Sequence, residues 1–416
     1  MKRFLFAVVV FLIAAHTAQA GNWPAWRGPN GNGVADEKGL PISWSADENI
    51  KWKVSLPGPG NSTPIVWGDR IFLTGALDAG ARRTLMCFDR ANGKKLWQEE
   101  LTCDAKEVTH KTNPYCASSP VTDGKSVFVW HGSAGVAAYD FNGKRLWHQD
   151  VGEFTHIWGY ASSPVLVDDL VIVSCGPGLR ALLVAFDKKT GRQVWKRDLP
   201  AAQSKEAKQF KGSWGTPVLR IDKDGNKQLV LGLPKQLIGF DPKTGKDIWT
   251  CRGLTDLVYT DSLISGDVVV AMSGYHGAAL ACRVGRGDVT ESGRLWLHAK
   301  KNPQRIGSGV VVDGHVYLLN EPGIAWCIEV QTGKIKWKER LSSKRSWCSM
   351  SYVDGRLYVP NENGETFILR PNPEKLDLIA TNRLDGEVTR GSPAFSDGQI
   401  FMRSHKHLYC IEESKK

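Results

Sequence analysis

The stretch AFDKKTGRQVW, residues 185–195, decides the fold because variants of it recur along the chain. Four further segments share its order of an acid, a polar turn with glycine, a basic residue and a tryptophan: CFDRANGKKLW (87–97), AYDFNGKRLW (138–147), GFDPKTGKDIW (239–249) and CIEVQTGKIKW (327–337). The acid accepts hydrogen bonds from turn amides and glycine supplies a left-handed position, so each copy predicts a tight hairpin. One copy would indicate only a hairpin, whereas five copies indicate a repeat protein.

A second pair of strands is predicted upstream of each hairpin. Eight segments contain alternating apolar residues around an Asp/Gly-type turn, as in SSPVLVDDLVIVSC (162–175). Four short antiparallel strands repeated about every 40 to 54 residues are typical of a β-propeller. We therefore predict an all-β fold, an eight-bladed β-propeller of four-stranded antiparallel sheets. A seven-bladed ring is the alternative, since the units that end near residues 296 and 384 are degenerate.

The two ends of the repeat region have complementary deficits. The last unit stops at LYCIE (408–412) without a fourth strand, and IKWKV (50–54) is a strand with no partners before it. We predict that this N-terminal strand completes the last blade, with Trp52 near Cys410, and so removes the open sheet edges. The tryptophans of the repeats are expected to dock on neighbouring blades. These residues are Trp52, Trp97, Trp147, Trp195, Trp249, Trp296 and Trp337.

The beginning of the chain has the pattern of a cleaved secretory signal. Residues 1–20 contain a basic start, a short apolar run and small residues up to Ala20. The alternative is a retained anchor, but the apolar run is too short to span a bilayer. We expect a signal peptide (1–20), an N-terminal extension (21–48) and a propeller (49–416), in a periplasmic or secreted protein that is soluble after cleavage.

Cysteine usage and charge narrow the possible partners. The chain has nine cysteines, an odd number, so at least one lacks a partner in the chain. Cys103 and Cys116 flank an inserted loop and are the best-placed pair for a disulfide. The cysteines and histidines do not have the spacing of a zinc site, so we predict no bound metal. The formal net charge is +11, but lysine and arginine are spread along the chain, so we expect no nucleic-acid partner.

The Asp-x-x-Thr-Gly-Lys-x-x-Trp repeats resemble those of the PQQ-like (quinoprotein alcohol dehydrogenase-like) eight-bladed β-propellers, over nearly all of residues 44–416. That family includes quinone-dependent dehydrogenases and the non-enzymatic propeller subunit of the outer-membrane β-barrel assembly machinery. The resemblance is specific for the fold and unspecific for the function.

A dehydrogenase of this family needs pyrroloquinoline quinone (PQQ), usually a Ca²⁺ ion, and an Asp base. The alcohol-oxidising members also carry an adjacent Cys-Cys pair. This chain has no Cys-Cys and no DxDxDG loop, and Asp256 and Asp261 are the only acids near the start of a repeat unit. We therefore predict no catalytic residue and no cofactor, with PQQ and Ca²⁺ as the alternative.

The resemblance implies a non-catalytic binding or protein-interaction scaffold of the cell envelope, in outer-membrane assembly for example, and we expect it to be a monomer. The alternatives are a PQQ-dependent alcohol or sugar dehydrogenase and a propeller that binds carbohydrate or an anionic ligand. Residues just before each inner strand should circle the channel mouth, where aromatic rings and arginine would bind a planar or anionic ligand or simply plug the opening. The candidates are His156, Trp158, Trp214, Tyr259, Arg305, Trp347 and Arg390.

Overall fold

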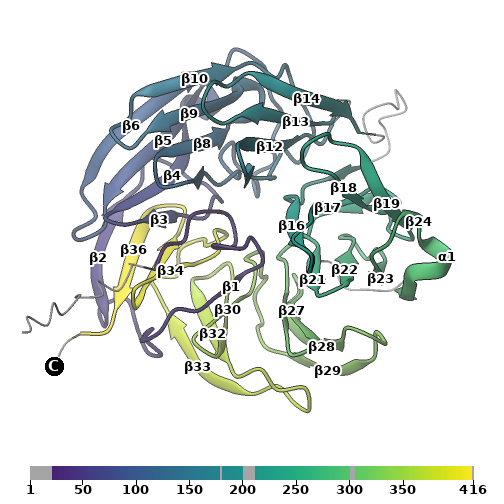
Figure 1. The fold of residues 1–416 in the computed structure, drawn as a ribbon. Helices are drawn as coiled ribbons and strands as arrows, with labels where there is room; N and C mark the ends of the chain where they lie inside the picture. The colour runs from purple at the N-terminus through teal and green to yellow at the C-terminus, as the bar shows by residue number, and fades with distance from the viewer. Residues whose placement is uncertain (1–20, 179, 200–210, 300–304, 415–416) are drawn as a thin grey trace, which may run out of the picture.

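The computed structural model describes residues 21–178, 180–199, 211–299 and 305–414, whose sheets are arranged as a ring around a central axis (Figure 1). The predicted signal peptide lies outside the described residues. Within them the strands form eight four-stranded antiparallel blades. The eight-bladed propeller is therefore confirmed, and the seven-bladed alternative is wrong.

The blades follow one another in chain order, each starting with its innermost strand. Blades 1 and 2 are β3 (Ile65–Trp67), β4 (Arg70–Leu77), β5 (Arg82–Asp89), β6 (Lys95–Thr102), β7 (Val121–Thr122), β8 (Ser126–Trp130), β9 (Val136–Asp140) and β10 (Arg145–Gln149). Blades 3 and 4 are β11 (Val165–Val167), β12 (Leu170–Cys175), β13 (Leu182–Asp187), β14 (Gln193–Asp198), β16 (Val218–Ile221), β17 (Lys227–Leu233), β18 (Gln236–Phe240) and β19 (Asp247–Arg252).

The second half of the ring repeats this plan. Blades 5 and 6 are β21 (Leu263–Ser265), β22 (Val268–Met272), β23 (Ala279–Arg283), β25 (Arg294–His298), β26 (Val310–Val312), β27 (His315–Leu319), β28 (Ile324–Glu329) and β29 (Ile335–Arg340). Blades 7 and 8 are β30 (Ser351–Val353), β31 (Arg356–Pro360), β32 (Glu365–Leu369), β33 (Leu378–Arg383), β34 (Ala394–Ser396), β35 (Gln399–Arg403), β36 (His407–Glu412) and β2 (Ile50–Ser55).

The ring closes as predicted, through a strand from the other end of the propeller. β2 pairs antiparallel with β36, and Trp52 lies opposite Cys410. The last blade is thus built from both ends of the repeat region, so its outer position is filled.

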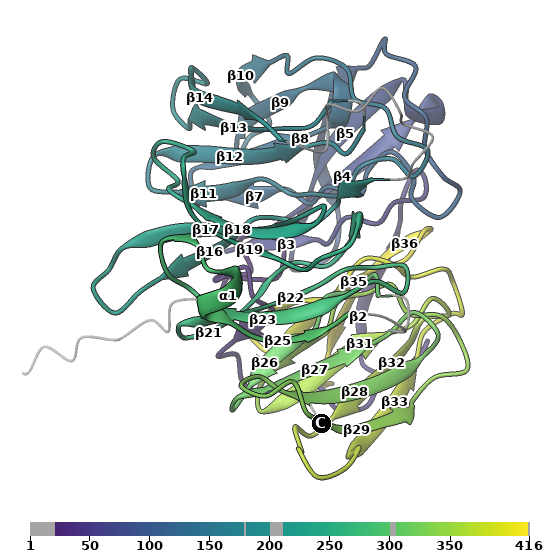
Figure 2. The same cartoon turned by 90° about the vertical axis from the view of Figure 1, so that its right-hand side faces the viewer.

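Short elements outside the blades are β1 (Val34–Ala35), β15 (Gly212–Ser213), β20 (Leu257–Val258), β24 (Gly287–Asp288), the 3₁₀ turns η1 (Asp78–Gly80) and η2 (Gly132–Ala134), and the single-turn helix α1 (Thr290–Gly293). α1 lies at the outer edge of the ring, which the side view also shows (Figure 2).

Six of the seven predicted tryptophans dock on the next blade in the same way. Each indole Nε1 donates to a backbone carbonyl of the adjacent turn at 2.8–3.0 Å; the donors are Trp52, Trp97, Trp147, Trp195, Trp296 and Trp337. Except at Trp337, whose partner turn has no glycine, a turn glycine lies under the ring: a Cβ on Gly191 would approach Trp147 Cγ to 2.7 Å, and Gly191 has φ +73°. The repeat therefore needs glycine for both the turn and the contact.

Trp249 departs from this pattern. Its Nε1 donates to Gln228 Oε1 at 3.0 Å, within its own blade. The next blade has no Asp-x-x-Thr-Gly turn at the equivalent position, because the connection there contains β24 and α1. With no turn carbonyl to cap, Trp249 instead packs in an apolar cluster that includes Val269 and Cys282 of blade 5. Trp249 therefore packs on the next blade without a hydrogen bond to a turn of that blade.

The apolar core lies between adjacent blades. One cluster joins Phe72 and Leu85 of blade 1 to Val127 and Ala137 of blade 2, and comparable clusters follow around the ring. Because each sheet buries both faces of its middle strands in this way, strands such as β12 and β22 are almost continuous apolar runs, whereas the outer strands are largely polar. The channel between the inner strands is left to be filled by loops and by the N-terminal segment.

Candidate functional site

A ring of small polar side chains surrounds the channel at the start of the inner strands. The backbone N–H at this position in one blade donates to the side-chain oxygen of its counterpart in the next blade, at 2.7–3.0 Å. These links tie neighbouring blades together near the axis. In chain order the ring consists of Thr63, Ser119, Ser163, Thr216, Asp261, Ser308, Ser349 and Ser392.

The N-terminal segment crosses the middle of the ring, as the dark purple trace leading to β1 shows (Figure 1). Trp23 exchanges two backbone hydrogen bonds with Val66 of blade 1, at 2.8 and 2.9 Å. Arg27 donates to the Gly309 carbonyl of blade 6 at 2.5 Å, and Tyr352 of blade 7 donates to the Gly33 carbonyl at 2.8 Å. β1 then adds in parallel to β30. The channel is therefore a pocket rather than a through-hole at this level.

The floor of the pocket is made by Trp26 and Asp261. Trp26 Nε1 donates to Asp261 Oδ2 at 2.6 Å, and the Thr216 N–H donates to Asp261 Oδ1 at 2.7 Å. Arg27 Nε lies 3.9 Å from the same carboxylate. Burial raises the pKa of Asp261 and lowers that of Arg27 to about 10, while their mutual attraction opposes both shifts. Asp261 thus acts as an anchor for the N-terminal segment.

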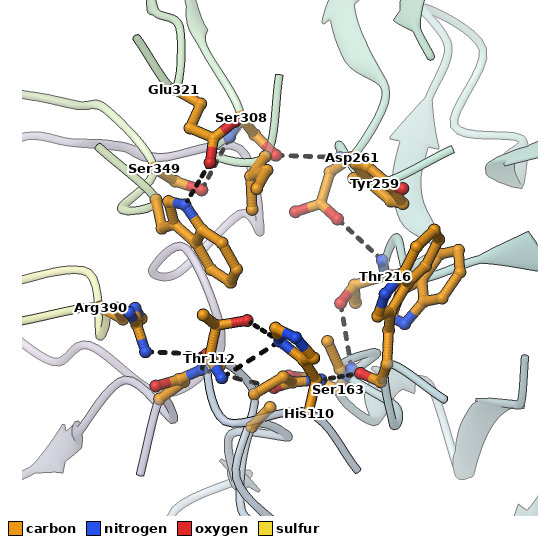
Figure 3. Close-up of a pocket in the computed structure, with 18 of the residues that line it drawn as sticks. His110, Thr112, Ser163, Thr216, Tyr259, Asp261, Ser308, Glu321, Ser349 and Arg390 are labelled. Atoms are coloured by element: carbon orange, nitrogen blue, oxygen red, sulfur yellow. Dashed lines mark hydrogen bonds between the residues drawn. The ribbon is translucent and has the colours of Figure 1, made fainter. Parts of the chain in front are cut away.

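Above this floor lies a cavity of about 400 Å³. Figure 3 shows the labelled side chains around its open centre, with Glu321, Ser308 and Ser349 facing Thr216 and His110. The loops that precede the inner strands and the loops between second and third strands both contribute lining residues, because both open on the same face of a propeller. This volume is within the range of small-molecule sites.

One wall of the pocket is aromatic. Trp158 lies nearly parallel to Tyr275, with ring centroids 6.2 Å apart and an interplanar angle of 28°. Trp214 and Tyr259 meet edge to face at 5.0 Å. The two-stranded parallel sheet of β15 and β20 positions this second pair, since Trp214 and Tyr259 directly follow its strands.

The opposite wall is charged, and its charges are paired. Arg390 donates from Nε to Glu362 Oε1 at 2.9 Å and lies over the Trp347 ring, 4.8 Å from its centroid. Trp347 Nε1 donates to Glu321 Oε1 at 3.2 Å, and Arg345 Nη1 lies 3.8 Å from the same oxygen. Each cation of this wall therefore has a protein carboxylate as its neighbour.

Five of the seven residues predicted at the channel mouth line the cavity: Trp158, Trp214, Tyr259, Trp347 and Arg390. His156 lies behind them, with its ring 4.9 Å from Trp214 and 5.5 Å from Trp158. Burial among these rings lowers the pKa of His156 to about 4.

Arg305 is the misplaced prediction. Its side chain is 1% exposed and its guanidinium lies 6.0 Å from the Trp326 ring, inside the blade rather than in the pocket lining. Burial lowers its pKa to about 10. A residue just before an inner strand can turn into the blade as easily as into the channel, and the sequence pattern does not distinguish these directions.

Sequence reasoning missed three lining residues that matter, namely Trp26, Tyr275 and Glu321. Tyr275 and Glu321 belong to loops between second and third strands, which the prediction did not consider although they share the same face. Trp26 lies in the N-terminal extension, and the repeat pattern does not predict where that segment lies in the fold. A search of both sets of loops would have found Tyr275 and Glu321.

The predicted disulfide is not formed. Cys103 and Cys116 are both free and buried. Arg83 Nη2 lies 3.6 Å from Cys103 Sγ, whereas Arg403 Nη2 lies 3.8 Å from Cys116 Sγ. Each thiol is therefore held against a different buried guanidinium, and flanking a loop was not a sufficient indication of pairing.

The residues of the pocket do not fit PQQ with a Ca²⁺ ion. Ca²⁺ requires six to eight oxygen ligands with carboxylates among them. Among the described residues no group of three or more His, Cys, Asp or Glu side chains is placed to hold a metal. The two arginines that could meet the quinone carboxylates, Arg345 and Arg390, already lie against Glu321 and Glu362.

Within the part of the chain that the structure describes, no helix has the length and apolar character needed to cross a membrane.

Comparisons with known proteins agree on the propeller. The assembly factor BamB of Legionella pneumophila (strain Paris) is 23% identical over 249 residues, which cover 60% of this chain and 49% of that protein. The quinohemoprotein alcohol dehydrogenase ADH-IIG of Pseudomonas putida is 22% identical over 203 residues, covering 44% of this chain and 26% of that protein. The chain thus spans less than half of the length of these curated relatives.

A solved structure shows the same fold. BamB from Moraxella catarrhalis superimposes with a TM-score of 0.62 at 13% identity, covering 88% of this chain and 97% of that one. The family model described as outer membrane protein assembly factor BamB matches residues 33–115 and 81–339, which is more than half of the 416 residues. The protein therefore belongs to this family of PQQ-like β-propellers.

Proposed function

We propose that the protein is a non-catalytic binding module of the cell envelope, periplasmic or secreted, and that the pocket at the channel mouth is its binding site. The observation that carries this proposal is the pairing of charges in the pocket. Asp261, Glu321, Arg345 and Arg390 each lie against another protein group of opposite charge or a hydrogen-bond donor. The lining carboxylates Asp261 and Glu321 already accept hydrogen bonds from Trp26 and Trp347, and His110 Nδ1 is engaged by Thr112, whereas a general base must be free to accept a proton from substrate.

The rim of the pocket supports contact with a large partner. Val108, Ile157, Tyr275 and Val388 are exposed apolar or aromatic side chains, and each lies in or beside a loop that lines the cavity. Apolar side chains gathered on one face of a protein are typical of an interaction surface. Similarity to an outer membrane assembly factor points in the same direction.

The test compares the purified protein with two variants for retention of material from a solubilised envelope fraction. The double variant Trp158→Ala with Trp347→Ala removes rings from both walls, and Leu378→Ala is a control because Leu378 is exposed on β33, an outer strand. We expect the wild type and the control to retain the same material and the double variant to lose it. Equal retention by all three proteins would contradict a binding role for the pocket.

A quinone-dependent alcohol dehydrogenase is the second candidate, because an enzyme with that name is among the relatives. The aromatic wall of Trp158 and Tyr275 supports it, since such rings stack on planar groups. The discriminating assay incubates the protein with PQQ and Ca²⁺ and follows dye reduction with a panel of alcohols and sugars. We expect no rate above that of free PQQ; a substrate-dependent rate would replace the first proposal by the second.

A further inference from the structure

The hydroxyl groups of the polar ring have unused hydrogen-bond donors. Ser163, Thr216, Ser308 and Ser349 line the cavity, and each side-chain oxygen accepts a backbone N–H from the preceding blade. A hydroxyl also has one O–H donor. Among the described residues no protein acceptor is found for these four O–H groups, and the four side chains surround the open centre of the pocket (Figure 3). The ring therefore presents neutral donors to an oxygen-rich ligand.

The aromatic wall provides flat apolar faces next to these donors. Tyr275 is 57% exposed at the mouth, and Trp158 lies behind it in a nearly parallel orientation. Trp214 and Tyr259 continue the wall toward the floor. The face of an aromatic ring carries negative charge density, which attracts the C–H groups on the face of a saturated ring. Flat aromatic faces beside neutral hydroxyls are complementary to a polyhydroxylated ring.

The charges of the pocket disfavour an anionic ligand. The Arg390 and Arg345 guanidinium groups lie against Glu362 and Glu321, and Asp261 is buried beside Arg27. An incoming carboxylate or phosphate would lose hydration without gaining a cation that lacks a counter-ion. Polyhydroxylated ligands without charge avoid this cost.

We propose that the pocket binds an uncharged sugar ring, as one or two residues of an envelope glycan. This inference rests on the proposed function, since it names the ligand class of the same site. Tyr275 provides the outer stacking face, and the Ser308 and Ser349 hydroxyls donate to sugar oxygens at the bottom of the pocket. The apolar rim around the mouth leaves room for the glycan to continue outward.

Intrinsic tryptophan fluorescence and calorimetry test the inference with defined probes. The probes are oligomers of equal length: cello-, malto- and N-acetylated chito-oligosaccharides, which are uncharged, and an oligogalacturonate, which is anionic. We expect at least one uncharged oligomer to bind about tenfold or more tightly than the oligogalacturonate. Tighter binding of the oligogalacturonate, or no binding of any uncharged oligomer, would overturn the inference.

Variants at Tyr275 distinguish the loss of the stacking ring from a general disturbance of the fold. Tyr275→Ala is expected to weaken the uncharged oligomer about tenfold or more, whereas Tyr275→Phe keeps the ring and should bind within about twofold of the wild type. Leu378→Ala is the matched surface control and should not change binding. An equal affinity of Tyr275→Ala and wild type would contradict the proposed role of this ring.

Treatment of the envelope fraction distinguishes failure of the inference from failure of the proposed function. Periodate cleaves the vicinal diols of cello- and malto-type chains, whereas chitinase cleaves N-acetylated chito-type chains, whose internal residues have no vicinal diol. One of these two treatments should abolish retention by the wild-type protein, and protease treatment should not. Retention that resists both glycan treatments but is lost with protease would overturn the sugar inference while the binding function stands. No retention from any fraction would overturn the proposed function itself.

Discussion

The two ends of the central channel differ in what their aromatic residues contact. At the closed end, Trp23 is fully buried, 5.2 Å from Phe395 in an edge-to-face arrangement, and its backbone bonds to β3. At the open end, Tyr275 is mostly exposed, and its ring contacts Trp158 and His276. The first end thus contributes to stability, and the second end leaves its aromatic surface available to a ligand.

This difference shows how one propeller can use one end of its channel for stability and the other end for binding. The N-terminal segment joins blades that are far apart in the chain, namely blades 1, 6 and 7. The opposite mouth can then vary its loops without loss of the blade contacts, which lie elsewhere. Stability and binding should accordingly respond to different substitutions.

The largest effect is expected at the closed end. Trp23→Ala removes a fully buried indole and should lower the free energy of unfolding by about 3–5 kcal/mol, because burial is lost and a cavity is left. Urea unfolding followed by circular dichroism measures this change. A loss below about 1 kcal/mol would show that the plug does not stabilise the ring.

A smaller effect is expected at Gly33, where the N-terminal segment passes blade 7. This glycine has φ +80°, and an added Cβ would lie 2.7 Å from Arg27 Nη2 and 3.0 Å from the Met350 carbonyl oxygen. Gly33→Ala should cost about 2–4 kcal/mol, from the left-handed backbone and the close contacts together.

Gly39→Ala is the matched control for this substitution. Gly39 also has a left-handed backbone, φ +69°, but has nothing within 4 Å of the added Cβ. The control should cost only about 1–2 kcal/mol. Equal losses in urea unfolding of the two variants would mean that the passage past blade 7 is not tightly packed.

The aromatic cluster at the open end should make stability depend on pH through His156. The folded-state pKa of His156 is lowered to about 4, below the value near 6.5 for the unfolded chain. Above pH 6.5 the group is neutral in both states; as the pH falls toward 4 the unfolded state binds a proton first, so stability is lost. The slope contributed is at most about 1.4 kcal/mol per pH unit.

The measurement is the melting temperature between pH 7 and 4.5 for wild type and His156→Phe. We expect the variant to lose less stability over this range, and an imidazole NMR titration of the wild type to have its midpoint near 4. An NMR midpoint near 6.5 would show that the ring is hydrated and that the cluster is loosely packed.

The smallest effect on stability is expected at the mouth. Tyr275→Ala should change the free energy of unfolding by less than about 0.5 kcal/mol, since the side chain is 57% exposed. The same urea experiment used for Trp23→Ala checks it. A large loss in the free energy of unfolding would mean that the open end also contributes to stability, so the two ends would not differ in this respect.

Most of the architecture could be predicted from the sequence because its signals are local. The acid, glycine and tryptophan of each repeat act within a single hairpin, and the deficits at the two ends of the repeat region identified the closing strand β2. Trp249 also packs on the next blade, but its hydrogen bond goes to Gln228, because the partner depends on the turn of the next blade, which the repeat does not describe.

The candidate site was predicted only in part because it is not local. Five lining residues were predicted from their position just before an inner strand, namely Trp158, Trp214, Tyr259, Trp347 and Arg390. The same criterion placed Arg305 in the pocket, although its side chain is buried inside the blade. Cys103 and Cys116 were expected to pair because they flank a loop, whereas each thiol lies against a different buried arginine.

The sequence by itself determined the repeat, the number of blades and the closure of the ring, since hairpins and apolar alternation depend on neighbours within a few residues. Only the tertiary structure decided that Trp26 meets Asp261 across 235 positions of the chain, that the charges of the pocket are paired, and that Tyr275 forms its outer wall. These contacts join segments from different blades and the N-terminal extension, so they exist only when the ring has closed around the axis.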